Sequence, residues 1–507
     1  MLFNSHVFIF LFLPLCLLGY GIAGRTLGGR AAMAFLALAS LGFYGWWNPV
    51  YVPLIVGVMT ANYLVGTWLG RLHERGGLGG RLLLTAGIVG NLAMLCWFKY
   101  ANFLIDSVRA TTGADLPLLE VVLPLGISFF TFQKIAYLVD SYRGLTRGYG
   151  FVDYSLFVLF FPQLIAGPIV HHKEVVPQFE RADGRITAAD LSVGLTIFAI
   201  GLFKKAILAD GIAPDANHLF GSVHEGGQPQ LVASWIGALA YTLQLYFDFS
   251  GYSDMAIGLS RMFGICMPAN FDSPYKAVNI VEFWRRWHMT LSRFLRDYLY
   301  VALGGNRKGP VRRYANLVTT MLLGGLWHGA GWTFVFWGLL HGGYLCVNHA
   351  WRHVTAGMAW ASSAWIRPAY QGVTLLAVIV GWVFFRAASF ADATAVLTGM
   401  VGVHGLGLPA RFEPLVTRYA PMVPVSYDPV GAKVASLAWI VVLGAIALFA
   451  PNTQEIMARA TPVLDMPTRT TRLRWSRSLP WAAATGGLAL IGLLSLGRVS
   501  EFLYFQF

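Results

Sequence analysis

Charged residues are scarce in this sequence. Of its 507 residues, 12% are Asp, Glu, Lys or Arg, whereas a soluble globular domain carries about 25%. Hydrophobic residues make up 56% of the chain, and the mean hydropathy is +0.58. This composition is unlike that of a soluble enzyme and predicts a protein whose solvent is mostly lipid.

Cysteines and familiar catalytic motifs are also few. The four cysteines, Cys16, Cys96, Cys266 and Cys346, are widely spaced. No pair has metal-ligand spacing, so we expect packing residues and no metal site. The sequence contains no G-x-S-x-G elbow, H-E-x-x-H motif or P-loop. These absences argue against a hydrolase of the elbow type, a zinc peptidase and an ATP-driven pump.

Basic residues exceed acidic ones, for a formal net charge of +13. They lie in short connections between apolar runs, which is typical of cytoplasmic anchoring and not of a nucleic-acid groove. Arg25 and Arg30, the 71–81 connection, and Arg143 with Arg147 alternate with loops that have almost no basic charge. We therefore expect these loops in the cytoplasm, the N-terminus in the periplasm, and no nucleic-acid partner.

Long apolar runs recur along the whole chain. Because a spanning helix needs about 20 mostly apolar residues, we predict an all-α, polytopic bundle of eleven to thirteen spans. The N-terminal run lacks the positive region of a signal peptide, so we expect a retained first span. The predicted spans are 6–23, 31–48, 51–69, 82–104, 118–138, 153–169, 187–208, 231–248, 315–349 (a span, turn and return), 370–387, 433–450 and 480–497.

A basic region at 276–313 interrupts this pattern. Within it, residues 282–300 have helical periodicity, with aromatic and leucine side chains on one face and Arg285, His288, Ser292 and Arg296 on another. The pattern predicts an amphipathic helix at the cytoplasmic interface, or one that dips into the membrane and returns. A membrane-surface anchor without chemistry is an equally good interpretation.

His328 stands inside the apolar stretch at 322–343. Arg313 precedes it by fifteen positions, so a helix would carry His328 about 22 Å inward, near mid-membrane. An ionisable residue at such depth usually faces a cavity or a polar partner. A histidine satisfied by a neighbouring helix is the alternative. Neutral imidazole can take a proton from a hydroxyl as its oxygen attacks a thioester, which makes His328 a candidate general base.

Several polar residues that precede His328 in the sequence are candidates for binding an acyl donor. His288 could bind a donor phosphate or polarise a carbonyl, or it could simply be an interfacial polar residue. Arg285 and Arg286 suit the phosphates of an anionic carrier such as coenzyme A, and equally suit anionic lipid. Asp297 is expected to pair with Arg293, four residues earlier.

Five long segments resemble one family. They are GISFFTFQKIAYLVDSYRG (126–144), FFPQLIAGPIV (160–170), LYFDFSGYSDMAIGL (245–259), EFWRRWHMTLSRFLRDYLYVALGGNRKG (282–309) and MLLGGLWHGAGWTFVFWGLLHG (321–342). They resemble the bacterial branch of the membrane-bound O-acyltransferases, closest to members that acetylate alginate. The resemblance is strongest over 240–342 and weakest over 350–480. At WHGAGWTF the chain lacks an asparagine that some relatives have.

The resemblance implies a single membrane domain over 1–507, with a catalytic core at 240–349, C-terminal spans at 370–507 and a central tunnel. It implies that His328 is catalytic and that His288 lines the same path. We expect Arg285, Arg286, Trp327, Asn306 and Asp297 to bind the donor or line the tunnel. Together with His328 and His288, these residues form the predicted site.

The resemblance also implies a reaction. An acetyl group would pass from a cytoplasmic thioester, expected to be acetyl-CoA as a substrate and not a resident cofactor, toward an exported polysaccharide. A periplasmic SGNH-type acetyltransferase and the export machinery would be the partners, in the inner membrane. Three alternatives stay open: a transporter or flippase with His328 as a proton relay, a structural subunit of an export complex, and D-alanyl transfer to teichoic acid.

Overall fold

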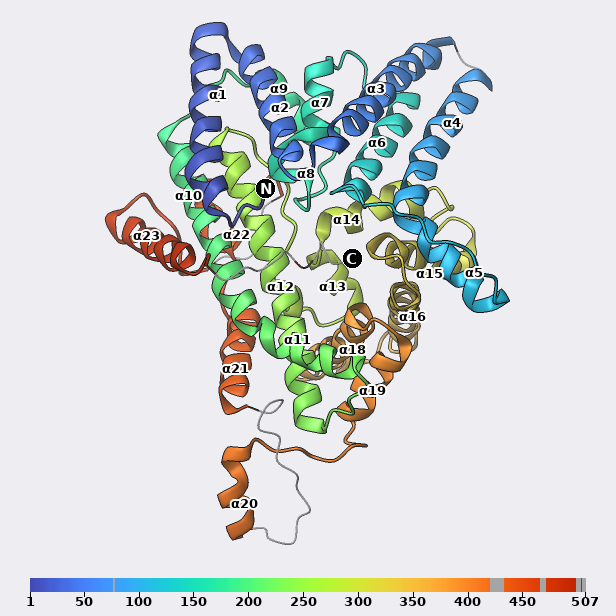
Figure 1. Ribbon diagram of the computed structural model, residues 1–507, viewed down its shortest axis with the longest axis vertical. Helices are drawn as coiled ribbons and strands as arrows, with labels where there is room; N and C mark the ends of the chain where they lie inside the picture. The colour runs from blue at the N-terminus through green and yellow to red at the C-terminus, as the bar shows by residue number, and fades with distance from the viewer. Residues whose placement is uncertain (76–77, 420–432, 466–470, 498–502, 504–507) are drawn as a thin grey trace. The chain divides into compact units, whose positions relative to one another are not determined.

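The computed structural model is helical throughout (Figure 1). It describes every residue except 76–77, 420–432, 466–470, 498–502 and 504–507. Among the described residues the only β pairing is one isolated bridge between Met267 and Val463. The predicted all-α class is therefore confirmed.

Several helices are built to cross a membrane. Five in the described part of the chain are long and apolar enough: Phe8–Leu27, Pro49–His73, Leu78–Thr112, Ala188–His224 and Ala364–Arg386. Two shorter apolar helices are Val434–Phe449 and Leu479–Leu494. The chain is thus a polytopic membrane protein, and by length and apolarity the remaining predicted spans are shorter or more polar helices.

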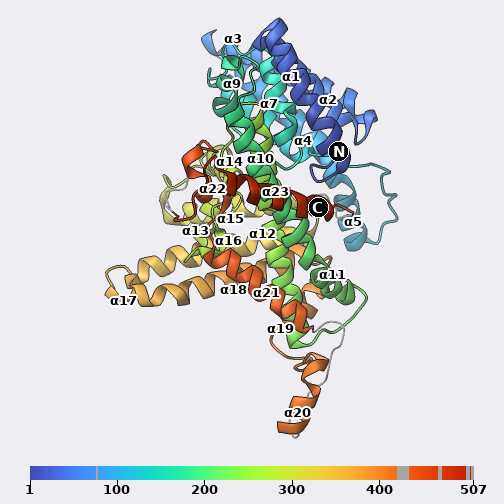
Figure 2. The same ribbon diagram turned by 90° about the vertical axis from the view of Figure 1, so that its left-hand side faces the viewer.

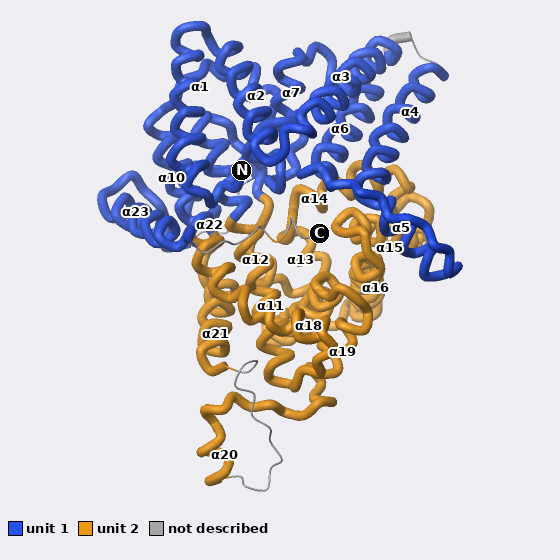
Figure 3. The backbone as a smooth tube through the Cα atoms, viewed as in Figure 1, with its two compact units in different colours: residues 1–202, 252–269, 453–497 blue, residues 203–251, 270–452, 498–507 orange. Residues whose placement is uncertain are grey.

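The chain forms two compact units, coloured separately in Figure 3. The first holds residues 1–202, 252–269 and 453–497, and the second holds 203–251, 270–452 and 498–507. Two helical stretches run through the boundary: the 188–224 stretch and α12 (Leu231–Met262).

The first unit is built on pairs of packed helices. α1 packs on α2, while α6 packs on both α3 and α4. The side-chain amides of Asn62 and Asn91 exchange hydrogen bonds of 2.7 and 3.3 Å between α3 and α4, a means of joining helices in lipid. The elements are η1 (Phe8–Phe12), α1 (Leu13–Leu27), α2 (Gly29–Gly45), η2 (Pro49–Tyr51), α3 (Val52–Arg75), α4 (Leu78–Leu95), η3 (Cys96–Tyr100), α5 (Ala101–Thr112), α6 (Ile127–Tyr142), α7 (Phe151–Leu159), α8 (Phe161–Leu164), α9 (His172–Arg181), α10 (Ala188–Phe203), α22 (Thr453–Ile456), η9 (Ala458–Ala460) and α23 (Leu479–Leu494).

Two predicted spans of this unit are wrong in detail. The helix expected at 118–138 begins only at Ile127. The run at 153–169 is two short helices, because Phe160 leaves the helical region with ψ 109°. Ser40 of α2 accepts the N–H of Phe161 at 3.1 Å, which satisfies a backbone donor that the break exposes.

The second unit contains the predicted core. α15 packs on α16, and α16 packs on α18, which Figure 2 shows side by side and joined near α17. The elements are η4 (Lys204–Ala209), α11 (Asp210–His224), the first part of α12, η5 (Pro274–Lys276), α13 (Ile280–Arg286), α14 (Met289–Phe294), η6 (Leu295–Tyr300), α15 (Gly309–His328), α16 (Trp332–Val354), α17 (Ala359–Ser362), η7 (Ala364–Ile366), α18 (Arg367–Arg386), α19 (Phe390–Met400), η8 (Ala410–Phe412), α20 (Glu413–Tyr419) and α21 (Val434–Phe449).

The two helices and the turn predicted at 315–349 are present as the α15–α16 hairpin, although neither helix is among those in the described part of the chain that are long and apolar enough to cross a membrane. The single helix predicted at 282–300 is wrong. It is divided into α13, α14 and the π-helical η6, because His288 adopts a left-handed conformation with φ 41° that ends α13 before α14 begins. A non-glycine residue in this region costs about 1–3 kcal/mol, so the surrounding contacts must hold it there.

A buried ion cluster joins η4 to α12 in the second unit. Lys205 Nζ lies 2.8 Å from Asp210 Oδ1 and 2.6 Å from Asp248 Oδ1. Lys205 is 2% exposed and Asp248 is 1% exposed. Charges this deep in a membrane protein are stable only as partners, so the cluster fixes the register of the two helices.

Candidate functional site

His328 is the last residue of α15, where three residues, 329–331, turn the chain into α16. Its side chain is buried, with 6% of the residue exposed. The ring centroid lies 5.2 Å from that of Trp337 and 5.3 Å from that of Phe385, both edge-on. An apolar, aromatic surround therefore encloses this imidazole.

A seam of three glycines, Gly325, Gly338 and Gly342, sets how closely α15 and α16 approach each other. An added Cβ would lie 2.2 Å from Phe334 O at Gly325, and 2.3 Å from Met321 O at Gly338. At Gly342 it would lie 2.9 Å from Val318 Cα. These contacts bring the backbones of α15 and α16 together, as small residues do between membrane helices. The seam fixes His328 relative to the side chains of α16.

His288 reaches the same cluster from between α13 and α14. Its ring centroid lies 6.5 Å from that of His328 and 6.3 Å from that of Trp327. The residue is fully buried, at 0% exposure. It therefore does not lie on the exposed polar face predicted for a 282–300 helix, because the left-handed turn directs it inward.

Hydrogen bonds define the protonation of His288. Asn270 Oδ1 accepts the backbone N–H of Thr290 at 3.4 Å and its hydroxyl at 2.8 Å, which identifies this amide atom as the oxygen. His288 Nδ1 lies 3.0 Å from the same oxygen and must donate to it. In the neutral ring, Nε2 therefore carries a lone pair. This Nε2 is buried and has no hydrogen-bond partner among the described residues.

His341 belongs to the cluster as well, although the sequence reasoning assigned it no role. Its ring lies 4.8 Å from Trp337 and 5.3 Å from Trp284, and the residue is 0% exposed. The signal that singled out His328, an ionisable residue within an apolar span, applies equally to His341 and could have found it.

The predicted donor-binding residues divide into two groups. Trp327 is buried beside His328. Arg286 is mostly buried and pairs with Glu282 at 2.7 Å and Asp272 at 3.3 Å. The exposed members, which lie outside the buried cluster, are Arg285, Asn306 and Asp297.

Asp297 has a different partner from the one expected. Its Oδ1 lies 2.7 Å from Arg296 Nε, so it pairs with the adjacent arginine and not with Arg293. Asn306 accepts a hydrogen bond from the hydroxyl of Tyr300. Both contacts are exposed and local, which fits a surface role for this connection.

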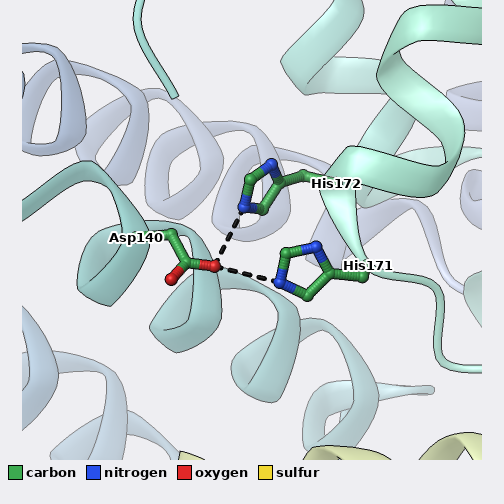
Figure 4. A group of neighbouring side chains, drawn as sticks. All are labelled: Asp140, His171 and His172. Atoms are coloured by element: carbon green, nitrogen blue, oxygen red, sulfur yellow. Dashed lines mark hydrogen bonds and ion pairs between the residues drawn. The ribbon is translucent and has the colours of Figure 1, made fainter. Parts of the chain in front are cut away.

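A second group of polar residues lies in the first unit (Figure 4). Asp140 Oδ2 is 3.0 Å from His171 Nε2 and 2.9 Å from His172 Nε2. Two imidazoles and a carboxylate can hold a divalent ion. Here, however, the backbone N–H of Lys173 donates to His171 Nδ1 at 3.2 Å, which places the ring proton on Nε2, toward Asp140. The arrangement is a hydrogen-bond network that ties α6 to the start of α9.

Two opposing effects act on the pKa of His172 in this network. Burial lowers the pKa of His172 below its usual range, while the hydrogen bond to Asp140 opposes the shift. The hydroxyl of Tyr149 lies 2.9 Å from His172 Nδ1 and occupies its second nitrogen. His171 and His172 were assigned no role from sequence, since only the folded chain brings them to Asp140.

The chain is similar in sequence to known membrane acyltransferases. A model of the membrane-bound O-acyltransferase family matches residues 81–391. The chain is 43% identical to a peptidoglycan O-acetyltransferase of Helicobacter pylori, over 80% of this chain and 81% of that one. It is 40% identical to a probable alginate O-acetylase, AlgI, of Pseudomonas putida over the whole of both chains. A teichoic acid D-alanyltransferase of Bacillus subtilis is 28% identical over 51% of this chain and 66% of its own.

Proposed function

Because the chain belongs to the membrane-bound O-acyltransferase family, we propose that it transfers an acetyl group from a cytoplasmic thioester, acetyl-CoA, toward an exported polysaccharide at the inner membrane. The relatives named for O-acetylation of peptidoglycan or alginate are 40–45% identical, whereas those named for D-alanyl transfer are 28–29% identical. That difference favours acetyl over D-alanyl. The observation that carries the proposal is the buried pair of His328 and His288.

His328 is the proposed general base. It takes the proton of the acceptor hydroxyl as the hydroxyl oxygen attacks the thioester carbonyl carbon. The carbon–sulfur bond of the resulting tetrahedral intermediate then breaks. The thiolate leaves and recovers the proton from His328, so that the ring is neutral again at the end of the cycle. Enclosure among Trp337 and Phe385 keeps water, a competing acceptor, from the base.

His288 supports this chemistry as an acceptor. Its Nε2 lone pair is suited to receive a hydrogen bond from the incoming hydroxyl before that hydrogen turns to His328, while Asn270 holds the other ring nitrogen. This arrangement favours an orienting role over the polarisation of a carbonyl, which would need a proton on Nε2.

The donor and the partners complete the proposal. A coenzyme A thioester is too polar to cross lipid, so the donor enters from the cytoplasm through the predicted tunnel, near the exposed Arg285. The acetyl group passes to the polysaccharide through a periplasmic SGNH-type acetyltransferase working with the export machinery.

The test measures acetyl transfer from labelled acetyl-CoA in membranes, and O-acetyl content of the exported polymer in cells. His328→Ala should lower both by about 10²–10⁴-fold, with membrane expression unchanged. His353→Ala, at the exposed end of α16, is the matched control. Unchanged acetylation in His328→Ala would refute the assignment of the base, and transfer from a D-alanyl carrier alone would refute the donor.

A further inference from the structure

Two buried N–H donors, on Trp337 and His341, lack an acceptor among the residues that the structure describes. Trp337 Nε1 and His341 Nε2 have no hydrogen-bond partner within the described part of the chain. Trp337 is 1% exposed and His341 is 0% exposed, so bulk water does not satisfy them. A buried donor left unsatisfied costs about 1–3 kcal/mol, and such groups in a native structure call for an explanation.

The tautomer of His341 follows from Trp284. The indole nitrogen of Trp284 lies 3.3 Å from His341 Nδ1, and an indole can only donate. His341 Nδ1 is therefore an acceptor, and the proton of the neutral ring is on Nε2. His341 Nε2 is thus a donor, in contrast to His288 Nε2, which carries a lone pair.

The two donors lie on one face of α16. Trp337 and His341 are four residues apart, which places them one above the other on a helix, and their ring centroids are 4.8 Å apart. Trp337 also contacts the ring of His328, with centroids 5.2 Å apart. Trp337 therefore adjoins the proposed base and His341 adjoins Trp337, and neither donor makes a hydrogen bond to the base.

The backbone of Gly381 in α18 packs closely against the ring of His341. A Cβ at this position would lie 2.7 Å from His341 Nε2 and 3.4 Å from its Cδ2. Any other residue would press on the nitrogen that carries the proton. The glycine therefore lets α18 approach the imidazole without displacing it.

We propose that His341 Nε2–H and Trp337 Nε1–H bind the acyl carbonyl oxygen of the donor. The inference rests on the proposed acyltransfer. As the hydroxyl oxygen bonds to the carbonyl carbon, the C=O π electrons move onto this oxygen, and the two N–H groups stabilise the negative charge. When the carbon–sulfur bond breaks, the C=O bond re-forms and the thiolate departs.

The ligand chemistry follows from the polarity of the groups. An acyl carbonyl oxygen offers two lone pairs and no proton, which matches two donors that have no acceptor of their own. The hydroxyl acceptor instead needs a group that takes its one proton, which is the role proposed for His328. The N–H donors are therefore suited to the acyl carbonyl, and the groups with a lone pair are suited to the hydroxyl.

The experiment compares His341→Phe, which removes the donor, with His341→Gln, whose amide restores an N–H. We expect kcat in His341→Phe to fall by about 10²–10³-fold with little change in KM, and His341→Gln to recover most of it. Trp337→Phe should fall in the same direction. His349→Phe is the control, because it makes the same substitution eight residues further along α16. The ring of His349 lies beside Tyr314, with centroids 6.4 Å apart. Equal kcat in His341→Phe and wild type would overturn the inference.

A spectroscopic measurement separates this role from a structural one. In the His328→Ala background, which should not turn over, the infrared carbonyl band of a carbon-13-labelled acetyl donor should lie at lower frequency when His341 is present than in His341→Phe. An unchanged band would overturn the inference. If His341→Phe does not fold, the band in Trp337→Phe decides in the same way. Failure of the wild type to transfer acetyl would instead refute the proposed function.

Discussion

Gly338→Ala should disable the protein without altering any polar group. The added Cβ would lie 2.3 Å from Met321 O and 2.9 Å from Leu322 Cα, both backbone atoms of α15. An ordinary contact between carbon and carbonyl oxygen is about 3.3 Å, so the two helices must separate by about 1 Å. His328 is the last residue of α15 and would move with it. A misplacement of about 1 Å can cost about 10²-fold in rate, and overpacking costs about 1–3 kcal/mol in stability.

The assay is acetyl transfer from labelled acetyl-CoA, with thermal unfolding in detergent as the measure of stability. The matched control is Gly343→Ala on the same helix, because a Cβ there meets no atom within 4 Å. That variant should keep its activity, and it should be unchanged or more stable by up to about 1 kcal/mol. Full activity in Gly338→Ala would refute the argument that the glycine seam positions the base.

Three further predictions follow from other contacts. Asn270→Ala removes the acceptor that holds His288 Nδ1, so kcat should fall about tenfold, the worth of one hydrogen bond; an unaltered rate would contradict it. Lys205→Met leaves Asp248 without its cation and should lower the unfolding free energy by about 3–5 kcal/mol, seen as a lower thermal midpoint. Because burial lowers the pKa of His172, the unfolded chain binds a proton more readily. Stability should therefore fall as the pH is lowered through and below about 6.5, the usual pKa of histidine, and His172→Gln should flatten that dependence in thermal scans.

Much of the fold could be predicted from the sequence because its signals are local. Apolar runs correctly predicted helices such as those at 370–387 and 433–450, which appear as α18, a helix able to span a membrane, and α21, a shorter apolar helix. The length of the apolar run at 315–349 correctly predicted two helices joined by a turn, which are α15 and α16. The prediction for 282–300 was wrong because its periodicity is continuous through His288, whereas contacts with Asn270 hold that residue in a left-handed conformation.

The candidate site, like the fold, was predicted from the sequence only in part. His328 and His288 could be singled out from residue type, depth and the surrounding motif, and Trp327 from its place beside them. His341 was passed over, because its value depends on the hydrogen bond from Trp284, fifty-seven residues earlier in the chain. The exposure of Arg285 and Asn306 likewise could not be read from a basic stretch.

The sequence by itself determined that this is a helical membrane protein, and which family its motifs belong to. Hydropathy and motif spacing are properties of neighbouring residues, so they can be read without the fold. Only the tertiary structure decided which nitrogens of His288 and His341 carry protons, since each proton is located by a partner far away in the chain. Hydrogen-bond direction is a property of the packed state, and it separates a ring nitrogen that accepts a hydrogen bond from one that donates.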